Sequence, residues 1–182
     1  MEQSYALVAY LPSQLGEFLD GLRRRLNPSF GDWLSHITIL PPRAICSQQE
    51  AAIATLRDKC HEVEPFAVTL GDISAFWPVT GVVYLSLSSG FPELLDLHRR
   101  LNCKEIEQKE QYSYFPHITI AQGLDENGVL SISREASLAW ATYKGERSVR
   151  IELLSLVNHT PDNRWVNIAQ VPLGKILVPS CQ

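Results

Sequence analysis

The tetrapeptide His-Ile-Thr-Ile occurs twice in the chain, at residues 36–39 and at residues 117–120. Histidine is scarce here, with five in 182 residues, and the two copies lie almost half the chain length apart. An imidazole can take or give a proton near neutral pH. A threonine hydroxyl can donate a hydrogen bond to an anionic oxygen. Two such pairs, brought together, have what acid–base cleavage of a phosphate ester requires, with no metal ion.

Strand geometry strengthens this interpretation. Side chains alternate between the two faces of a β-strand, so His36 and Thr38 share one face while the isoleucines between them point to the other. The same holds for His117 and Thr119. Each copy therefore predicts a strand that buries its isoleucines and presents an imidazole and a hydroxyl. The competing interpretation is an ordinary half-exposed strand, which shows the same alternation.

The elements that would position these strands are a mixture of strands, helices and hairpins. Residues 4–11 and 35–40 read as strands, and residues 13–26 as a helix with Leu15, Phe18, Leu19, Leu22 and Leu26 on one face. Pro41-Pro42 is expected to close the second strand. Ser47–Glu50 has the pattern of a capping box and predicts a helix to about Val63.

The second half contains hairpins, helices and a strand. Residues 66–76 and 82–88 predict a hairpin around Pro78–Gly81, and a helix starts near Phe91-Pro92. Residues 117–121 predict a strand and residues 131–142 a helix. Strands at 148–157 and 164–171 form a second predicted hairpin. This order lacks βαβα regularity and indicates an α+β fold with antiparallel sheets covered by helices.

Composition and charge fit an ordinary soluble globular protein, which we expect to form one two-lobed domain over residues 1–182. Hydrophobic residues make up 45% and charged residues 20% of the chain, and the net charge is −4. The acidic balance argues against binding to duplex DNA and favours a small phosphorylated ligand or a strand end. The N-terminal residues do not resemble a signal peptide, and no segment is long and apolar enough to span a membrane. We therefore expect a cytoplasmic protein, and a monomer.

The motifs resemble those of a known family, the 2H phosphoesterases, and in particular their bacterial 2′-5′ RNA ligase / 2′,3′-cyclic phosphodiesterase branch. The resemblance rests on SHITILPPR at 35–43 and PHITIA at 116–121, supported by LLSLV at 153–157 and NRWVNIAQVPLG at 163–174. The sequence departs mildly from the family at one position: the residue after each Thr is Ile, where relatives often have Leu. The resemblance spans nearly the whole chain.

The resemblance implies a fold and a set of roles. The fold would be bilobal and pseudo-twofold, with an antiparallel sheet and outer helices in each lobe and a groove between the lobes. The activity would be hydrolysis of 2′,3′-cyclic phosphates or 2′-5′-linked esters of RNA ends or nucleotides, without a cofactor. By resemblance alone, His36 is the proton donor and His117 the proton acceptor. The identical motifs do not distinguish these roles.

Four residues near the motifs are further candidates for substrate binding. Arg43 follows the first motif and could reach a phosphate, although a plain surface arginine fits as well. Tyr112, Tyr114 and Phe115 precede the second motif and could stack on a base or fill the core. The pair Phe76-Trp77 carries the same two interpretations.

The remaining histidines and the cysteines have no partner motif. We assign His61, His98 and His159 to structural or surface roles, and Cys46, Cys60, Cys103 and Cys181 to free thiols. The chain lacks HxH, HExxH and paired cysteines, so a zinc site built from His36, His117 and a cysteine remains only an alternative. Two other functions also stay open: a non-catalytic module that binds nucleotides or RNA ends, and 2′-5′ RNA end-joining by the reverse reaction.

Overall fold

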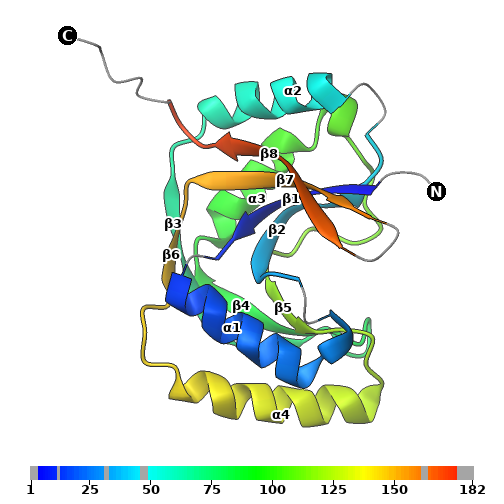
Figure 1. Ribbon diagram of the computed structural model, residues 1–182, viewed down its shortest axis with the longest axis vertical. Coiled ribbons are helices and arrows are strands. Elements are labelled where there is room, and N and C mark those ends of the chain that lie inside the picture. The colour runs from blue at the N-terminus through cyan, green and yellow to red at the C-terminus, as the bar shows by residue number, and fades with distance from the viewer. Residues whose placement is uncertain (1–3, 12, 31–32, 46–48, 161–163, 176–182) are drawn as a thin grey trace.

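A computed structural model describes residues 4–11, 13–30, 33–45, 49–160 and 164–175. Its strands and helices are interspersed along the chain, with β3 and β4 and then β6, β7 and β8 following one another directly (Figure 1). In chain order they are β1 (Ser4–Tyr10), α1 (Ser13–Leu26), η1 (Pro28–Phe30), β2 (His36–Arg43), α2 (Gln49–His61), β3 (Phe66–Ala75), β4 (Val83–Ser89), α3 (Phe91–Leu101), η2 (Lys104–Ile106), β5 (Ile118–Ala121), α4 (Glu126–Thr142), β6 (Ser148–Ile151), β7 (Leu153–His159) and β8 (Trp165–Pro172).

The strands form two four-stranded sheets. The first HxT motif lies in an edge strand, and so does the second, apart from His117, which immediately precedes its strand. The first sheet has the order β2-β1-β7-β8 and the second the order β5-β4-β3-β6, with antiparallel pairing throughout. The strand of the first motif, β2, pairs with β1, and the strand of the second motif, β5, pairs with β4. The two sheets thus repeat one arrangement, which confirms the predicted bilobal α+β fold of antiparallel sheets.

Helices from both halves of the chain cover each sheet. Although α1 follows the first strand of the first sheet, it packs with α4 beside the second sheet. Conversely, α3 follows β4 but packs with α2 against the first sheet. Figure 1 shows α1 and α4 together at one end of the molecule and α2 and α3 together at the other. This exchange of helices ties the two lobes to each other.

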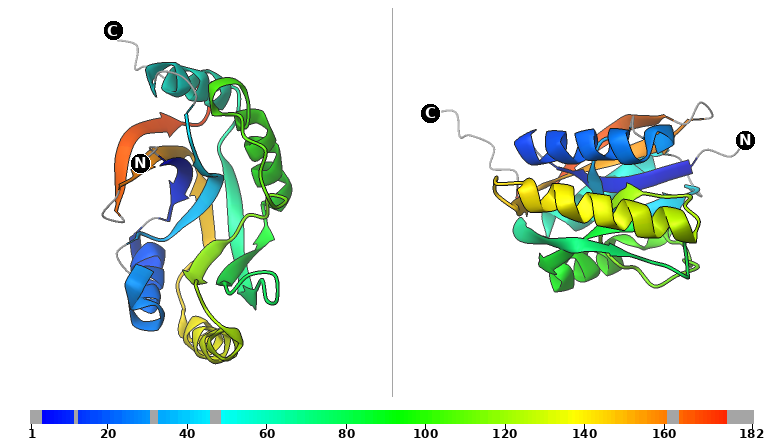
Figure 2. Two further views of the ribbon diagram at one scale, coloured as in Figure 1. Left: turned by 90° about the vertical axis from the view of Figure 1, so that its right-hand side faces the viewer. Right: turned by 90° about the horizontal axis from the view of Figure 1, so that it is seen from below.

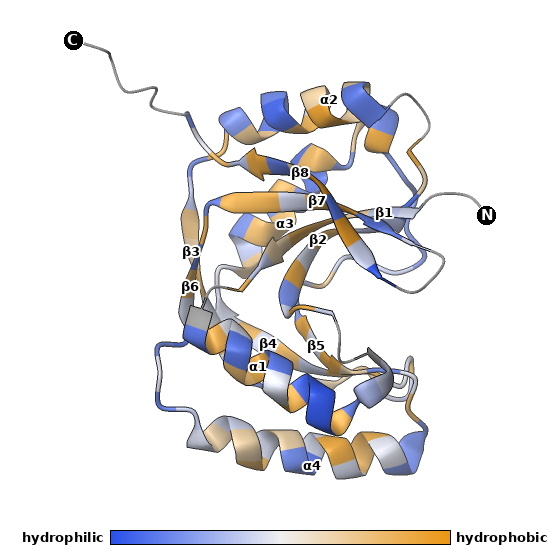
Figure 3. Ribbon diagram, in the orientation of Figure 1, coloured by the Kyte–Doolittle hydropathy of each residue, from blue (hydrophilic) through white to orange (hydrophobic). Residues whose placement is uncertain are grey.

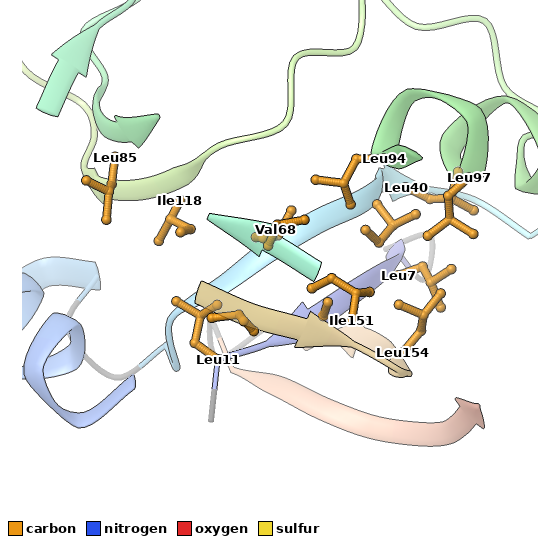
Figure 4. Packing of buried hydrophobic residues seen from close by; sticks show 14 of the residues in the cluster. Leu7, Leu11, Leu40, Val68, Leu85, Leu94, Leu97, Ile118, Ile151 and Leu154 are labelled. Carbon is orange, nitrogen blue, oxygen red and sulfur yellow. The ribbon is translucent and has the colours of Figure 1, made fainter. Parts of the chain in front are cut away.

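The core is continuous across the two lobes. One cluster of buried residues includes Leu7 and Leu154 of the first sheet, Val68 and Ile118 of the second, and Leu94 of α3. Figure 4 shows these side chains converging from both sheets. The buried face of α1 includes Leu15, Leu19 and Leu22, as the helical spacing predicts. Figure 3 shows the matching pattern, with apolar residues along the strands and in stripes along the helices.

The predicted strand at 148–157 is in fact two strands that belong to different sheets. Residues Ser148–Ile151 pair with β3 in the second sheet, whereas Leu153–His159 pair with β1 in the first. The break falls at Glu152, whose carbonyl accepts a hydrogen bond from Leu173 N at 2.8 Å. An unbroken apolar run shows that both strands are buried, but it carries no sign of which sheet each joins. The second predicted hairpin, β7–β8, is confirmed.

Two element boundaries also differ from the prediction. Strand β2 continues through Pro41 and Pro42 to Arg43. This is possible because β2 is an edge strand, where a proline removes no ladder hydrogen bond. Helix α4 starts at Glu126, five positions earlier than expected, because the Asp125 side chain caps it by accepting a hydrogen bond from Gly128 N at 2.7 Å. The capping box at Ser47 lies partly outside the described residues.

Candidate active site

The two motifs show the predicted alternation of buried and accessible side chains. Ile37, Ile39 and Ile118 are fully buried and Ile120 is 1% exposed, so all four isoleucines belong to the core. The histidines and threonines of both motifs are half-buried on the opposite faces. Strands β2 and β5 come from different sheets but contact each other. The structure therefore brings the two HxT faces together.

Helix α1 holds the chain that leads into the first motif. The Asp20 carboxylate accepts a hydrogen bond from Ser35 N at 2.6 Å, and Arg23 Nη1 donates to the Trp33 carbonyl at 2.9 Å. Ser35 O in turn accepts from Leu11 N at 3.1 Å. These three contacts, one to Trp33 and two to Ser35, fix the backbone immediately before His36. Its imidazole is therefore presented from a rigid turn, as an acid–base group requires.

Both catalytic candidates are oriented by the same local contact. His36 Nδ1 lies 2.7 Å from the Leu34 carbonyl, and His117 Nδ1 lies 2.7 Å from the Phe115 carbonyl. A carbonyl oxygen can only accept, so in each ring Nδ1 must carry the proton. The neutral ring then has a free lone pair on Nε2, and the protonated ring has a donor there. Each histidine is thus prepared to exchange one proton through Nε2.

A cavity of about 520 Å³ opens beside the second motif. Three of the four motif side chains, Thr38, His117 and Thr119, are among its lining residues. The rest of the lining is rich in aromatic rings and amides. It consists of Pro41, Pro42, Phe76, Val79, Thr80, Val82, Gln108, Glu110, Gln111, Tyr112, Ser113, Tyr114, Phe115 and Gln122. The cavity has room for a nucleoside-sized group next to the HxT residues.

The surroundings of both histidines favour their neutral forms. Burial lowers the pKa of His36 to about 4, and repulsion by Arg23 and by His117 contributes to the lowering. Burial also lowers the pKa of His117. Strands β2 and β5 contact each other, so the charge of His117 reaches the ring of His36. An anion bound between them would raise both pKa values, because a nearby negative charge stabilises an imidazolium.

Aromatic rings flank each histidine. On the second sheet, the ring of His117 lies 4.9 Å from that of Phe76 and 5.4 Å from that of Tyr84. On the first sheet, the ring of His36 lies 6.1 Å from that of Tyr10 and 6.0 Å from that of Trp165. Strand pairing accounts for the two tyrosines. Tyr10 of β1 pairs with His36 of the first motif, and Tyr84 of β4 pairs with Thr119 of the second.

Arg43 lies outside the cavity lining, in a buried network. Its side chain is 2% exposed and donates to the Pro41 and Ile106 carbonyls, to Asn102 Oδ1 at 2.6 Å and to Glu110 Oε1 at 2.6 Å. These acceptors occupy the guanidinium of Arg43. Arg43 therefore supports the segments that it binds, rather than contacting a phosphate as the sequence suggested. A buried guanidinium needs such partners. Apart from Pro41, the partners come from the 102–110 segment, which sequence spacing could not place.

The three aromatic candidates before the second motif all line the cavity, but they differ in exposure. Tyr112 is 56% and Phe115 42% exposed, so both are free to contact a ligand. Tyr114 is largely buried: its ring stacks on His98 with centroids 4.0 Å apart, and its hydroxyl donates to the Thr38 carbonyl at 2.8 Å. Of the hairpin pair, Phe76 lines the cavity, and Trp77 is exposed beside it.

The other histidines and the described cysteines have different surroundings. His98 is buried and its Nδ1 lies 2.8 Å from the Ile39 carbonyl, and His61 is exposed on α2. His159 lies in a group of rings near His36. Cys60 and Cys103 are free thiols, while Cys46 and Cys181 lie outside the described residues. In the described ranges, no three His, Cys, Asp or Glu side chains are grouped so that they could hold a metal ion, and no helix could span a membrane.

Several residues of the site were not anticipated from the sequence. Tyr10 and Trp165 reach His36, Tyr84 reaches His117, and Glu110 and Gln122 line the cavity. Strand pairing brings the two tyrosines to the motifs, so a correct pairing of the strands would have identified them. Nothing in the local sequence marks Trp165 or Glu110, because their positions depend on how β8 and the 104–117 segment fold back.

Comparisons with known proteins agree with this architecture. The model of the 2′-5′ RNA ligase superfamily matches residues 11–163. A Bacillus licheniformis protein, named as an inferred phosphoesterase, is 26% identical over 124 residues that cover 68% of this chain and 73% of the relative. A Bacillus cytotoxicus protein with the same kind of name is 30% identical over 121 residues, or 66% of this chain and 70% of the relative.

Solved structures share the fold at low sequence identity. Escherichia coli LigT is 17% identical with a TM-score of 0.67, and the match covers 96% of this chain and all of LigT. A Thermus thermophilus protein is 14% identical with a TM-score of 0.63, covering 95% of this chain and all of that one. Because the family model spans most of the chain and includes both HxT motifs, the chain belongs to the 2′-5′ RNA ligase superfamily, the 2H phosphoesterases.

Proposed function

We propose that this phosphoesterase is a metal-independent phosphodiesterase that hydrolyses 2′,3′-cyclic phosphates or 2′-5′-linked esters of nucleotides or RNA ends. The observation that carries the proposal is the repeated geometry of the two motifs. At each one, an Nδ1 atom lies 2.7 Å from the carbonyl two residues before it, which leaves Nε2 for proton transfer. In such a pair, one histidine can act as the base and the other as the acid.

In the proposed reaction each histidine moves one proton. Nε2 of His117 takes a proton from the attacking water as its oxygen bonds to phosphorus. The bond from phosphorus to the ribose oxygen breaks, and His36 donates the proton of Nε2 to that leaving oxygen. The product is a phosphate monoester, and proton exchange with solvent returns both rings to their starting states. The division of roles follows the resemblance of the motifs to those of the family.

Thr38 and Thr119 are the proposed ligands of the non-bridging phosphate oxygens. Both line the cavity and both share a strand face with a catalytic candidate. Hydroxyl donors placed there would hold the phosphorus between the two rings and stabilise the charge that develops during attack. The anion would also raise the pKa of His36 and so favour the protonated form that an acid requires.

A nucleotide is the proposed substrate because the cavity and the relatives agree. Exposed rings of Tyr112 and Phe115 offer stacking surfaces, and Gln108, Gln111 and Gln122 offer amides for a base edge. E. coli LigT, which has the same fold, has been crystallised with 3′-AMP and with ATP. Hydrolysis is expected to dominate over end-joining, since water is present at ~55 M unless a site excludes it.

The test is a substrate panel with product analysis. We expect turnover of 2′,3′-cyclic nucleotides or 2′-5′ oligonucleotides in the presence of EDTA. His36→Ala and His117→Ala should each lower turnover by at least ~10²-fold, the usual scale for acid–base groups. The double variant should be little worse than either one, because the two groups act as a unit. His61→Ala is the matched control, since His61 is exposed on α2 and should be silent.

Three results would change the proposal. Binding of nucleotides without turnover would indicate a binding module, and joined RNA ends would indicate the reverse reaction. Loss of turnover in EDTA that zinc or manganese restores would indicate metal-dependent chemistry.

A further inference from the structure

A group of aromatic rings lies beside His36, away from the cavity next to His117. We call it the first-sheet aromatic wall, and it consists of Tyr10, Trp33, His159 and Trp165. The ring of Trp165 is central: its centroid lies 5.6 Å from that of Trp33, 5.6 Å from that of His159 and 6.0 Å from that of His36. Figure 2 (left) shows that β8, the edge strand of the first sheet next to β7, is strongly curved.

The wall packs against a small cluster of buried apolar side chains, which we call its floor. Ala6, Val8 and Val157 are buried in a cluster separate from the main core, and only Tyr10 and Trp165, among the described residues, are packed against it as partly buried hydrophobic residues. Val8 pairs with Thr38 and Tyr10 pairs with His36. Because side chains at paired positions share a face, this floor belongs to the same face of the sheet as the first HxT motif. The wall therefore borders the reaction site directly.

The indole of Trp165 has an unused hydrogen-bond donor. Nε1 is buried and has no acceptor among the residues that the structure describes. A buried N–H without a partner is costly, and the N–H of a buried tryptophan usually finds one. Because Nε1 is covered, an acceptor would reach it only if the groups that cover it moved.

The wall and the cavity flank the histidine pair from two sides. The cavity is lined by His117 but not by His36, whereas Trp165 and Tyr10 contact His36. A phosphate held by the two threonines would thus have one aromatic-lined space on the His117 side and aromatic rings on the His36 side. A phosphodiester carries two organic substituents on phosphorus, so each of them could lie against one of these two surfaces.

From this arrangement we infer that the first-sheet aromatic wall is a second binding subsite, which takes the base or other flat group on the far side of the scissile phosphate. The inference rests on the proposed function and narrows its substrate class. An acyclic diester with a flat group on each side, such as a dinucleoside monophosphate or the end of a strand, fills both subsites. A cyclic mononucleotide fills only one and leaves the wall empty.

The charges of the site agree with a substrate that carries no further phosphate. Among the described residues that line the cavity none is a lysine or arginine, and Glu110, the one acidic side chain of that set, is paired with Arg43. Terminal phosphates usually require arginine or lysine ligands. The appropriate probes are therefore the 2′-5′-linked dinucleoside monophosphate ApA and 2′,3′-cyclic AMP.

The test compares these two substrates with one set of variants. Trp165→Ala should lower kcat/KM for 2′-5′ ApA by roughly 5- to 150-fold, the range seen when one base loses an aromatic stacking partner. It should change kcat/KM for 2′,3′-cyclic AMP by less than about 3-fold, because that substrate does not reach the wall. Trp165→Phe should recover part of the loss, since it restores the ring but not the N–H.

Val166→Ala is the matched control. Val166 is the next residue of β8, is 44% exposed, and points to the opposite face, so neither substrate should be affected. An equal loss on both substrates in Trp165→Ala would show that the wall merely supports His36, and would overturn the inference. Unchanged turnover of 2′-5′ ApA would overturn it as well.

Calorimetric binding separates failure of the subsite from failure of the proposed function. If neither substrate is turned over, the proposed function fails. The subsite then still predicts that wild-type protein binds 2′-5′ ApA more tightly than Trp165→Ala does. Equal dissociation constants for the two proteins would reject the subsite, whatever the activity.

Discussion

Tyr114 donates a hydrogen bond from its hydroxyl to the backbone carbonyl of Thr38 over 2.8 Å, and so joins the two HxT motifs through one side chain. Tyr114 lies three residues before His117, while Thr38 is the hydroxyl residue of the first motif. Burial raises the pKa of the Tyr114 phenol, with a further contribution from Glu110, so the hydroxyl remains a donor at any working pH. The contact ties the segment that leads into the second motif to the strand of the first motif.

Removing this hydroxyl should affect both stability and catalysis. Tyr114→Phe keeps the ring that stacks on His98 but deletes the donor to Thr38. We expect a loss of about 1 kcal/mol of unfolding free energy, the usual value for one intramolecular hydrogen bond. We also expect kcat to fall more than KM rises, because the motifs lose their mutual position rather than a substrate contact. Denaturant unfolding and steady-state kinetics measure the two effects.

Tyr112→Phe is the matched control for that variant. Tyr112 also lines the cavity, but it is 56% exposed and its hydroxyl is bonded only to the neighbouring Gln111 side chain among the described residues. Its unfolding free energy should not change. Equal kcat and stability in Tyr114→Phe and in wild type would show that the hydroxyl does not position the motifs.

The buried pair of Arg43 and Glu110 should be important for folding. Arg43→Met removes the partner of a carboxylate whose side chain is only 13% exposed, and breaking a buried pair costs about 3–5 kcal/mol. Thermal and denaturant unfolding should show this loss. Arg99→Met is the control: its ion pair with Asp96 is exposed, so stability should be almost unchanged. Similar losses in the two variants would contradict the supporting role of Arg43.

The motif residues themselves were predictable because they obey a local rule. Alternation along a strand is a property of the backbone, so the burial of Ile37 and Ile118 and the accessibility of their polar neighbours followed from residue types alone. The antiparallel hairpins β3–β4 and β7–β8 were predictable for a similar reason, since turn residues separate two β-rich runs.

What the sequence did not reveal depends on contacts between distant segments. Arg43 looked like a surface residue because its acceptors at 102–110 are some sixty positions away. The division of 148–157 between two sheets depends on which neighbours each half meets. Trp165 is placed beside His36 by the curl of β8, which no local pattern encodes. Tertiary context, rather than propensity, decided each of these positions.

The threonines give a third prediction, which concerns transition-state stabilisation. Thr38→Val or Thr119→Val keeps a β-branched strand former but removes the hydroxyl. If the hydroxyl acts as an oxyanion donor, each change should cost about 2–4 kcal/mol of transition-state stabilisation. Thr→Ser should recover much of the activity. Valine variants with normal kcat/KM at both positions would show that the threonines serve only the strand.

A fourth prediction concerns the dependence of stability on pH. Unfolded His36 takes up a proton near pH 6.5, but the folded protein resists until about pH 4 because the ring is buried. Between these values the unfolded state binds more protons, so the unfolding free energy is highest above about pH 6.5 and falls as the pH drops. The loss should be on the order of 1–3 kcal/mol, complete below about pH 4. His36→Asn should reduce this dependence, and His61→Asn should not.

The last prediction is a difference between two pH–rate profiles. In the free protein, burial lowers the pKa of His36 to about 4 and also lowers that of His117 below its ordinary value near 6.5. Since kcat/KM reports the groups of the free enzyme, its optimum should lie on the acid side of pH 6.5.

The profile of kcat reports the enzyme–substrate complex, in which the phosphate anion stabilises imidazolium and raises both pKa values. The optimum of kcat should therefore lie at a higher pH than that of kcat/KM, and both profiles should be bell-shaped, because one ring must be neutral while the other is protonated. Measurements between pH 4 and 9 suffice. Coincident optima would mean that the bound anion does not face the rings, and a single sigmoid would mean that only one histidine carries a proton.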